Sequence, residues 1–176
     1  PDDQVLENLM VHYKQHVDSS RQNLTQLGFP QGAELAIITC TTTDARSSID
    51  RYEVLIQFAF QNRYKRFLSL KHKNHLIFLI NRTQVTTSNS PFSKTVEDLY
   101  DKITLNNDSL NVIIGKGSFY EDSAHIHNSY KTSLTVIQLA PMHNNRFLCK
   151  YTEMWADPII MGVQHRALVA FFDQVI

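Results

Sequence analysis

The stretch NVIIGKGSFYEDSAHIHNSYKTSLTVIQLA, Asn111–Ala140, combines three local signals that decide the fold class of this chain. Its apolar, β-branched opening predicts a buried strand. Gly115 and Gly117 then predict a turn that lets the chain leave the strand. Acidic residues and apolar side chains at spacings of three and four predict a helix, which carries Ser129 and Tyr130. The order of strand, glycine turn and helix is typical of a domain that combines a sheet with covering helices.

The residues upstream extend this arrangement into a complete α/β (α+β) domain. Apolar runs bounded by polar residues predict strands, and two such runs flank the polar tetrad Lys71–Asn74, which indicates a hairpin. The predicted elements, in chain order, are a strand at 35–41, a helix at 49–63, strands at 67–70 and 75–80, a helix from 88, a strand at 110–114, a helix from 126 and a strand at 146–151. We therefore predict a single mixed sheet of about five strands covered by helices.

An amphipathic helix is predicted before the first strand. Its apolar residues fall at spacings of three, four or seven, which gives a near-heptad seam interrupted at Ser20 and ended by Gly28. Such a seam can pack on its own domain or on a second copy of the chain, and the sequence leaves both alternatives open. For the second alternative, a homodimer, the candidate interface residues are Leu6, Met10, Tyr13 and Val17.

The composition is that of an ordinary globular domain. In 176 residues, 43% are hydrophobic and 19% are charged, and Lys plus Arg balance Asp plus Glu at 17 each. A DNA-binding module is expected to be basic, so we expect no direct contact with DNA from this chain. The longest apolar runs, such as Leu76–Ile80, fall far short of the about 20 residues that span a bilayer. We expect a cytoplasmic protein without a membrane partner, with Cys40 buried as a small hydrophobe.

Metal-dependent nucleotidyl transfer would need clustered carboxylates at the end of the first strand and at the hairpin tip. After the first strand the sequence offers only Asp44 and, further along, Asp50. Cationic and polar side chains occupy the hairpin tip, which consists of Lys71, His72, Lys73, Asn74 and His75. We therefore predict no catalytic residue, no metal and no cofactor.

Two other patterns that suggest ligands have simpler interpretations. The sequence Gly-Lys-Gly-Ser at 115–118 lacks the earlier glycine of a Walker phosphate loop, so we interpret both glycines as structural. Three histidine pairs have the spacing or the turn position of a metal site. They are His12 with His16, His72 with His75, and His125 with His127, and we expect exposed side chains rather than metal ligands at each.

From Leu24 onward the sequence resembles the degenerate GGDEF-like domain of CdaR/PucR-type bacterial transcriptional regulators, which are regulators of sugar diacid and purine catabolism. NVIIGKG stands where that family has a strand and a glycine turn, and HNSYKTSLTVIQLA resembles its Ser-Tyr helix. LTQLGFPQGAELAIITC resembles its helix end and first strand, and HRALVAFFDQVI resembles a linker helix. In active diguanylate cyclases the hairpin turn carries Gly-Gly-Asp/Glu-Glu-Phe. The segment Lys71–His75, which stands at that position, contains no Gly and no carboxylate.

The resemblance implies a nucleotide-cyclase-like fold without catalysis and three segments: a dimerisation or signalling helix at 1–28, the degenerate domain at 33–152, and a linker helix at 153–176. The last would lead to a helix-turn-helix domain outside this chain, which we expect to be a piece of a longer protein. The implied function is to couple effector sensing or dimer geometry to DNA binding. Two alternatives remain: a module that binds a small molecule or nucleotide in a cyclase-like pocket, and an active cyclase.

Overall fold

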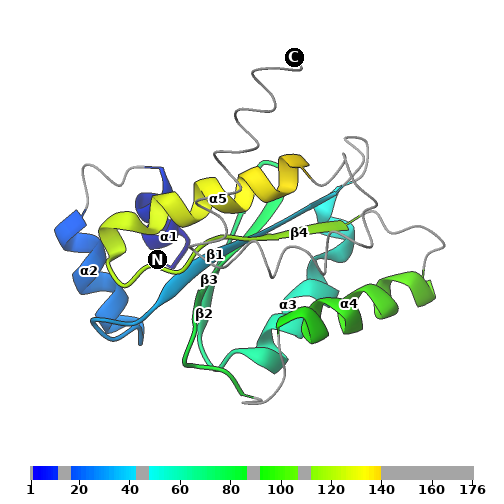
Figure 1. Ribbon diagram of the computed structural model, residues 1–176, viewed down its shortest axis with the longest axis horizontal. Coiled ribbons are helices and arrows are strands. Elements are labelled where there is room, and N and C mark those ends of the chain that lie inside the picture. Colours follow the sequence, from blue (N-terminus) through cyan, green and yellow to red (C-terminus); the bar gives the residue numbers. More distant parts are fainter. Residues whose placement is uncertain (1, 12–16, 43–47, 87–91, 107–111, 140–176) are drawn as a thin grey trace.

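The computed structural model describes residues 2–11, 17–42, 48–86, 92–106 and 112–139. Helices and strands alternate through most of this part of the chain (Figure 1). The elements in chain order are α1 (Asp2–Met10), α2 (Val17–Gln26), β1 (Leu35–Thr42), η1 (Ile49–Tyr52), α3 (Glu53–Arg63), β2 (Phe67–His72), β3 (His75–Asn81), α4 (Phe92–Asn106), β4 (Val112–Lys116), η2 (Ser123–His125) and α5 (Ile126–Leu139).

The four described strands form one sheet in the order β2-β3-β1-β4, and every neighbouring pair is antiparallel. The predicted α+β class, with one sheet covered by helices, is confirmed. The described sheet differs from the predicted one in direction, because β3 inserts between β1 and β2. The strand–helix–strand unit β1-α3-β2 therefore contains two parallel strands that do not pair with each other, which is the split βαβ arrangement. The strand predicted at 146–151 lies outside the described residues.

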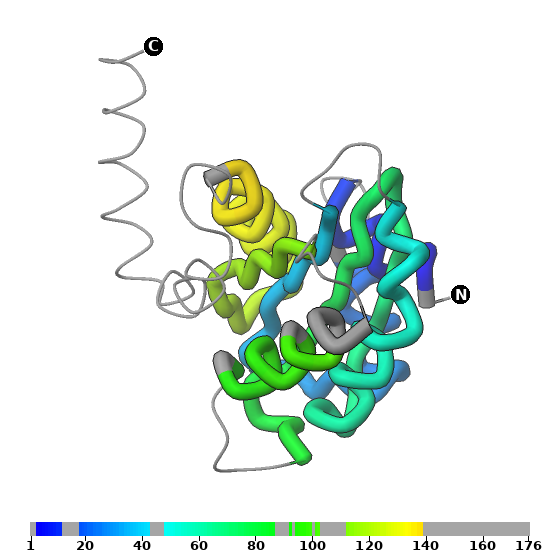
Figure 2. Tube along the Cα trace, turned by 90° about the vertical axis from the view of Figure 1, so that its right-hand side faces the viewer, coloured from blue at the N-terminus to red at the C-terminus, as the bar shows by residue number. Residues whose placement is uncertain are grey.

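Helices cover both faces of this sheet. Alternate residues of a strand point to opposite faces, and β1 is buried along its whole length. Ile38 and Cys40 of β1 face α3 and α4, whereas Ile37 and Leu35 face the side on which α1, α2 and α5 pack. Figures 1 and 2 show α4 and α5 on opposite sides of the strands. The domain thus has three layers, and the burial predicted for Cys40 is confirmed.

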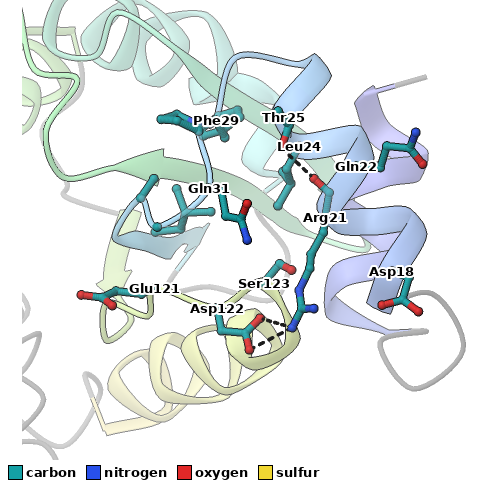
Figure 3. Close-up of a pocket in the computed structure, with 14 residues that line it drawn as sticks. Asp18, Arg21, Gln22, Leu24, Thr25, Phe29, Gln31, Glu121, Asp122 and Ser123 are labelled. Carbon is teal, nitrogen blue, oxygen red and sulfur yellow. Dashed lines mark hydrogen bonds and ion pairs between the residues drawn. The ribbon is translucent and has the colours of Figure 1, made fainter.

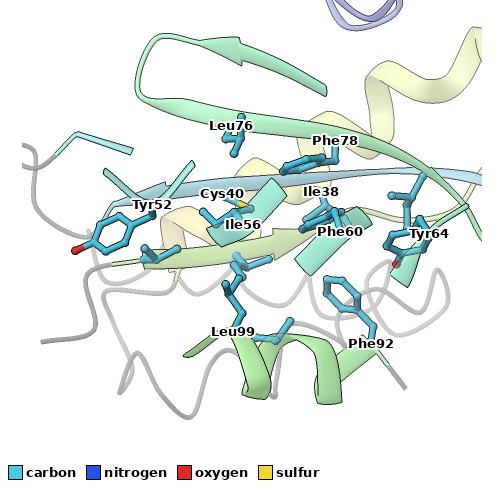
Figure 4. Packing of buried hydrophobic residues seen from close by; sticks show 14 of the residues in the cluster. Ile38, Cys40, Tyr52, Ile56, Phe60, Tyr64, Leu76, Phe78, Phe92 and Leu99 are labelled. Atoms are coloured by element: carbon cyan, nitrogen blue, oxygen red, sulfur yellow. The ribbon is translucent and has the colours of Figure 1, made fainter. Parts of the chain in front are cut away.

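Aromatic rings fill the layer between the sheet and helices α3 and α4 (Figure 4). Phe60 of α3 stacks on Phe78 of β3, with ring centroids 3.9 Å apart and an interplanar angle of 8°. Phe67 and Phe92 approach the Phe60 ring edge-on, with centroids 6.2 and 6.5 Å away. Edge-to-face contacts such as those of Phe67 and Phe92 stabilise a core beyond the area that they bury.

The N-terminal segment differs from its prediction in one respect. It forms two helices, α1 and α2, and the predicted interruption at Ser20 lies inside α2, where Ser20 is buried. Leu6 and Met10 of α1 are 0% and 4% exposed and pack with Leu68 and Leu79 of the sheet. These two residues therefore follow the first of the two alternatives, packing within their own domain. The other two candidate interface side chains, those of Tyr13 and Val17, are not described.

The end of α2 was predicted correctly at Gly28. This glycine has φ +93°, and the Phe29 amide donates to the Leu24 carbonyl over 2.9 Å, the long backbone bond of a Schellman motif. No helix among residues 2–11, 17–42, 48–86, 92–106 and 112–139 combines the length and the apolar composition needed to cross a membrane. The predicted linker helix at 153–176 falls outside these ranges.

Candidate functional site

The β2–β3 hairpin tip is the position at which a cyclase-like domain would carry its catalytic turn. His72 and His75 face each other across the hairpin, so Lys73 and Asn74 form a two-residue turn. Lys73 has φ +55°, the left-handed conformation that such short hairpins require and that usually selects glycine or asparagine. The hairpin is confirmed; β2 extends two residues further into the polar tetrad than predicted, and β3 begins at His75 as predicted.

Asn74 ties this turn to the end of β1. Its side-chain Oδ1 accepts from the Ile49 amide over 2.8 Å, and its Nδ2 donates to Thr42 Oγ1 over 2.7 Å. The Thr41 hydroxyl donates to the Asn74 carbonyl over 3.1 Å. The hairpin tip is therefore fastened to the first strand and to η1, and the Asn74 amide is committed to structural hydrogen bonds.

Lys71, at the end of β2, forms ion pairs with two acidic residues. Its Nζ lies 2.8 Å from Asp50 Oδ1 and 3.7 Å from Glu53 Oε2. The hydrogen bond to Lys71 holds the pKa of Asp50 below its usual range, and the same bond raises the pKa of Lys71. Asp44, the other carboxylate considered after β1, lies outside the described residues. The carboxylates that a divalent cation would need here are engaged by an ammonium group instead.

The two tip histidines, which were predicted to be exposed, are both half-buried. Burial, followed by the charges of His72 and Lys73, lowers the pKa of His75 below its ordinary value of 6.5. Within the part of the chain that the structure describes, no three side chains of His, Cys, Asp or Glu gather into a group able to hold a metal ion. His12 and His16 lie outside that part.

Gly115 and Gly117 allow α5 to pack directly on the sheet. A Cβ atom on Gly117 would lie 2.0 Å from the Ser129 carbonyl oxygen, and one on Gly115 would lie 2.5 Å from the Ser133 carbonyl oxygen. Neither glycine has a positive φ, and Gly115 belongs to β4 itself. Both glycines are thus required by close approach of two backbones, whereas the sequence predicted that they form a turn.

The serines of α5 supply hydrogen bonds at this close contact. The Ile37 amide donates to Ser129 Oγ over 2.8 Å, and Thr39 Oγ1 and Ser133 Oγ share a hydrogen bond of 2.8 Å. Ser129 and Ser133 are both fully buried. The neighbouring Tyr130 is half-buried against the α1 side of the core, and this burial raises its pKa. Ser129 therefore connects α5 to β1, and Tyr130 packs against the α1 side of the core.

A polar groove, which no sequence pattern predicted, lies between α2 and the start of α5 (Figure 3). It has a volume of about 630 Å³. Arg21 of α2 reaches across it to Asp122, the N-cap residue of η2, with bonds of 2.9 and 3.1 Å to the two carboxylate oxygens. The Asp122 pKa is lowered, first by a hydrogen bond from the Ala124 amide and then by Arg21. This ion pair joins the N-terminal helices to the helix that covers the sheet.

Comparison with known proteins finds a similarity among solved structures. No family model matches the chain, and no curated protein matches it. Among solved structures it is similar to the regulator of polyketide synthase expression from Bifidobacterium adolescentis, with 14% sequence identity and a TM-score of 0.48. The similarity covers 81% of this chain and 51% of that chain, so this chain spans about half the length of the regulator.

Proposed function

We propose that this chain is a non-catalytic regulatory domain of a bacterial transcriptional regulator, which couples effector sensing or dimer geometry to a DNA-binding domain outside it. The proposal is supported by the resemblance of its strand, glycine and Ser-Tyr helix segments to the GGDEF-like domains of such regulators. The observation that carries it is the hairpin tip, where Lys71 binds Asp50 and Glu53.

The ion pairs of Lys71 disfavour metal-dependent catalysis because of their charge. Nucleotidyl transfer by metal ions requires carboxylates that are available to bind the cations, and the bound cations hold the nucleotide phosphates at the site. An ammonium group 2.8 Å from Asp50 competes with a metal ion for the carboxylate and repels it. The Asn74 side chain, which lies in the turn, is engaged in fastening the hairpin to β1 and η1. Both features favour a cyclase-like shell that performs no cyclase chemistry.

The groove provides a route by which such a domain would transmit a signal. The Arg21–Asp122 pair connects α2 with the start of α5, and α5 is hydrogen-bonded to β1 through Ser129. A change in the position of the N-terminal helices, caused by a second copy of the chain or by an upstream sensor, would thus reach the centre of the sheet through a chain of polar contacts.

Enzymatic activity is tested directly on the full chain. Purified protein is incubated with GTP or ATP and with Mg²⁺ or Mn²⁺, and the nucleotides are separated by chromatography. We expect no cyclic or linear dinucleotide and no cyclic mononucleotide. Metal-dependent product that increases with protein concentration would contradict the proposal and favour the active cyclase.

The regulatory part is tested with a fusion. Residues 1–176 are placed before a DNA-binding domain that represses its operator only as a dimer, and reporter expression is measured in bacteria. We expect repression, and we expect Val17→Asp to relieve it while Val54→Asp, a matched change at a residue 81% exposed on α3, does not. Absence of repression by a well-expressed fusion would contradict the dimerising role. Relief by the control variant alone would place the interface on α3.

A further inference from the structure

The strand β2 lies at one edge of the described sheet and pairs there only with β3. A two-residue hairpin turn closes on a hydrogen-bonded pair of residues, which here is His72 with His75. Hydrogen-bonded residues alternate along an antiparallel strand, so the even-numbered residues of β2 bond to β3. The odd-numbered residues turn their backbone N–H and C=O groups outward. These residues define the outer edge of β2, and they are Phe67, Ser69 and Lys71.

The outer edge of β2 offers backbone groups that are available to another strand. Among the hydrogen bonds within the described part of the chain, none uses its outward N–H or C=O groups. The two edge strands differ in this respect from their surroundings, since β4 is buried along its whole length, whereas every residue of β2 except Leu68 is at least partly exposed. A row of unpaired backbone groups is a template for pairing with a further strand.

The charge that would protect this edge is balanced within the domain. Edge strands commonly carry a lysine or a proline that prevents pairing with other chains. The only lysine of β2 is Lys71, and its Nζ lies 2.8 Å from Asp50 Oδ1 and 3.7 Å from Glu53 Oε2. The preceding segment, Phe67–Leu70, contains no charged residue and no proline. The outer edge of β2 therefore carries little net charge that would repel a second strand.

The sequence of β2 suits pairing with a second copy of itself. Two antiparallel copies that meet at this edge must place outward residues opposite outward residues, so the symmetric registers are centred on Leu68, Ser69 or Leu70. The register centred on Ser69 uses every outward residue of the strand. Ser69 then faces its own copy, and Phe67 faces the partner's Lys71. This register forms about six backbone hydrogen bonds, and a shift to either neighbouring register forms fewer.

The side chains also favour the register centred on Ser69. Leu68 then lies opposite the partner's Leu70, on the face of the sheet where Leu6 of α1 packs. On the other face, the ring of Phe67 meets the aliphatic stem of the partner's Lys71. No two like charges of β2 lie directly opposite each other in this arrangement. Leu70, which is only half-buried within one copy, gains an apolar neighbour.

We propose that two copies of this chain join through the outer edge of β2, antiparallel and centred on Ser69, so that one continuous sheet runs through both copies. The interface is isologous, because each copy contributes the same strand. Since α1 packs on β2, the α1 helices of both copies then lie on the same face of the joined sheet. The inference rests on the dimerising role in the proposed function and names a surface for it.

Association is measured on the full chain by sedimentation velocity over a range of concentrations, and we expect a dimer. Ser69→Pro removes an outward N–H but no bond to β3, a position at which an edge strand tolerates proline. We expect it to raise the dissociation constant of the dimer at least about tenfold. Ser69→Ala keeps the N–H, so its dimer should be as stable as that of the wild type. Circular dichroism confirms that both variants are folded.

The outcomes separate this inference from the proposed function. A chain that stays monomeric at every concentration would overturn both the pairing through β2 and the dimerising role. A dimer whose dissociation constant is the same with Ser69→Pro would overturn the pairing through β2 alone and leave the dimerising role in place.

Disulfide cross-linking tests the register and does not depend on the proline variant. In a Cys149→Ser background, Ser69→Cys places two cysteines opposite each other, with Cα atoms about 5.5 Å apart, a separation that a disulfide spans. We expect a covalent dimer after mild oxidation, seen by non-reducing electrophoresis, whereas the buried Cys40 should not react. Val54→Cys, at a residue 81% exposed on α3, is the control for random collision. Cross-linking of Ser69→Cys no stronger than that of Val54→Cys would overturn the pairing, and cross-linking of Leu70→Cys instead would overturn the register.

Discussion

The two faces of the sheet are packed by different means. Toward α3 and α4, large rings such as Phe60 and Phe78 fill the space with apolar volume. Toward α5, small residues leave little side-chain volume between the helix and the sheet. Gly117 therefore lies against the Ser129 backbone, and Ser129 accepts a hydrogen bond from β1. The contact with α3 and α4 depends on the amount of buried apolar surface. The contact with α5, which shares its face of the sheet with the apolar cluster under α1 and α2, depends on the distance between two backbones.

This difference indicates how each face responds to change. A core of apolar side chains tolerates some substitution if its volume is kept, because contacts can be rearranged. A contact between backbones has no flexible part that can yield, and its hydrogen bonds have narrow limits of distance. We therefore expect α5 to have a uniquely defined position on β1 and β4, and the four predictions below test this comparison.

The largest effect is expected for Gly117→Ala. The new Cβ would lie 2.0 Å from a backbone oxygen, so α5 would have to move away from the sheet, and we expect a loss of about 4 kcal/mol in the free energy of unfolding. Urea denaturation monitored by circular dichroism gives the value. Gly32→Ala is the control, since Gly32 has φ +84° but no atom within 4 Å of an added Cβ, and its cost should be about 1–2 kcal/mol. Equal losses would show that close approach does not matter at Gly117.

Phe60→Ala should cost slightly less, about 3–4 kcal/mol, because it opens a cavity in the stacked aromatic cluster. The same denaturation experiment measures it. Phe58 lies on the same helix but is 50% exposed, and we expect Phe58→Ala to cost less than about 1 kcal/mol. A small loss for Phe60→Ala would mean that the α3 face does not depend on its aromatic volume.

Ser129→Ala should lower the free energy of unfolding by about 1–3 kcal/mol, because it leaves the buried Ile37 amide without its acceptor. Hydrogen exchange followed by NMR should show faster exchange of that amide. Thr135 lies on the same helix and its hydroxyl donates only to the helix carbonyl of Lys131, so Thr135→Ala is expected to change stability by less than about 0.5 kcal/mol. An unchanged exchange rate of the Ile37 amide would show that its hydrogen bond to Ser129 does not stabilise the contact between α5 and β1.

The smallest effect is expected for Arg21→Gln, below about 1 kcal/mol, since both partners of the Arg21–Asp122 pair are exposed and screened by water. Because the Asp122 pKa is lowered in the folded protein, its contribution is present above the ordinary value of 3.8 and is lost as the pH falls through the native pKa. The difference between wild type and variant should therefore shrink from pH 7 toward pH 3.

Lys94→Gln provides the control for this pair. It breaks a contact of 3.0 Å to Asp98 within α4, which joins no two elements. We expect high salt to weaken both effects. A larger loss for Lys94→Gln than for Arg21→Gln would contradict a connecting role for Arg21 between α2 and α5.

Local patterns in the sequence were sufficient for most elements. The strand at 35–41, the hairpin and the helices around Phe60 and Tyr130 were predicted within a few residues, because burial imposes a period on the apolar residues of each element. The break between α1 and α2 was misplaced at Ser20, because a small polar residue that is buried in a helix has the same local appearance as an interruption. Strand direction was missed because it depends on which strands pair, and pairing is not a local property.

The candidate sites likewise differ in whether the sequence alone can reveal them. The lack of carboxylates at the hairpin tip is visible in five consecutive residues, and it needs no structure to be recognised. The outer edge of β2 becomes visible only when the strand order is known. The residues of β2 alone resemble those of any half-buried strand, and no spacing shows that the strand lies at an edge.

The class of the domain, its main elements and the cationic character of its hairpin tip could all be predicted, because they follow from residues that are neighbours in the chain. Three features became visible only in the folded domain: the close approach of α5 to Gly115 and Gly117, the ion pairs of Lys71 with Asp50 and Glu53, and the contact of the buried Lys116 with aromatic rings. These contacts join distant segments, and the register of the antiparallel sheet sets their distances.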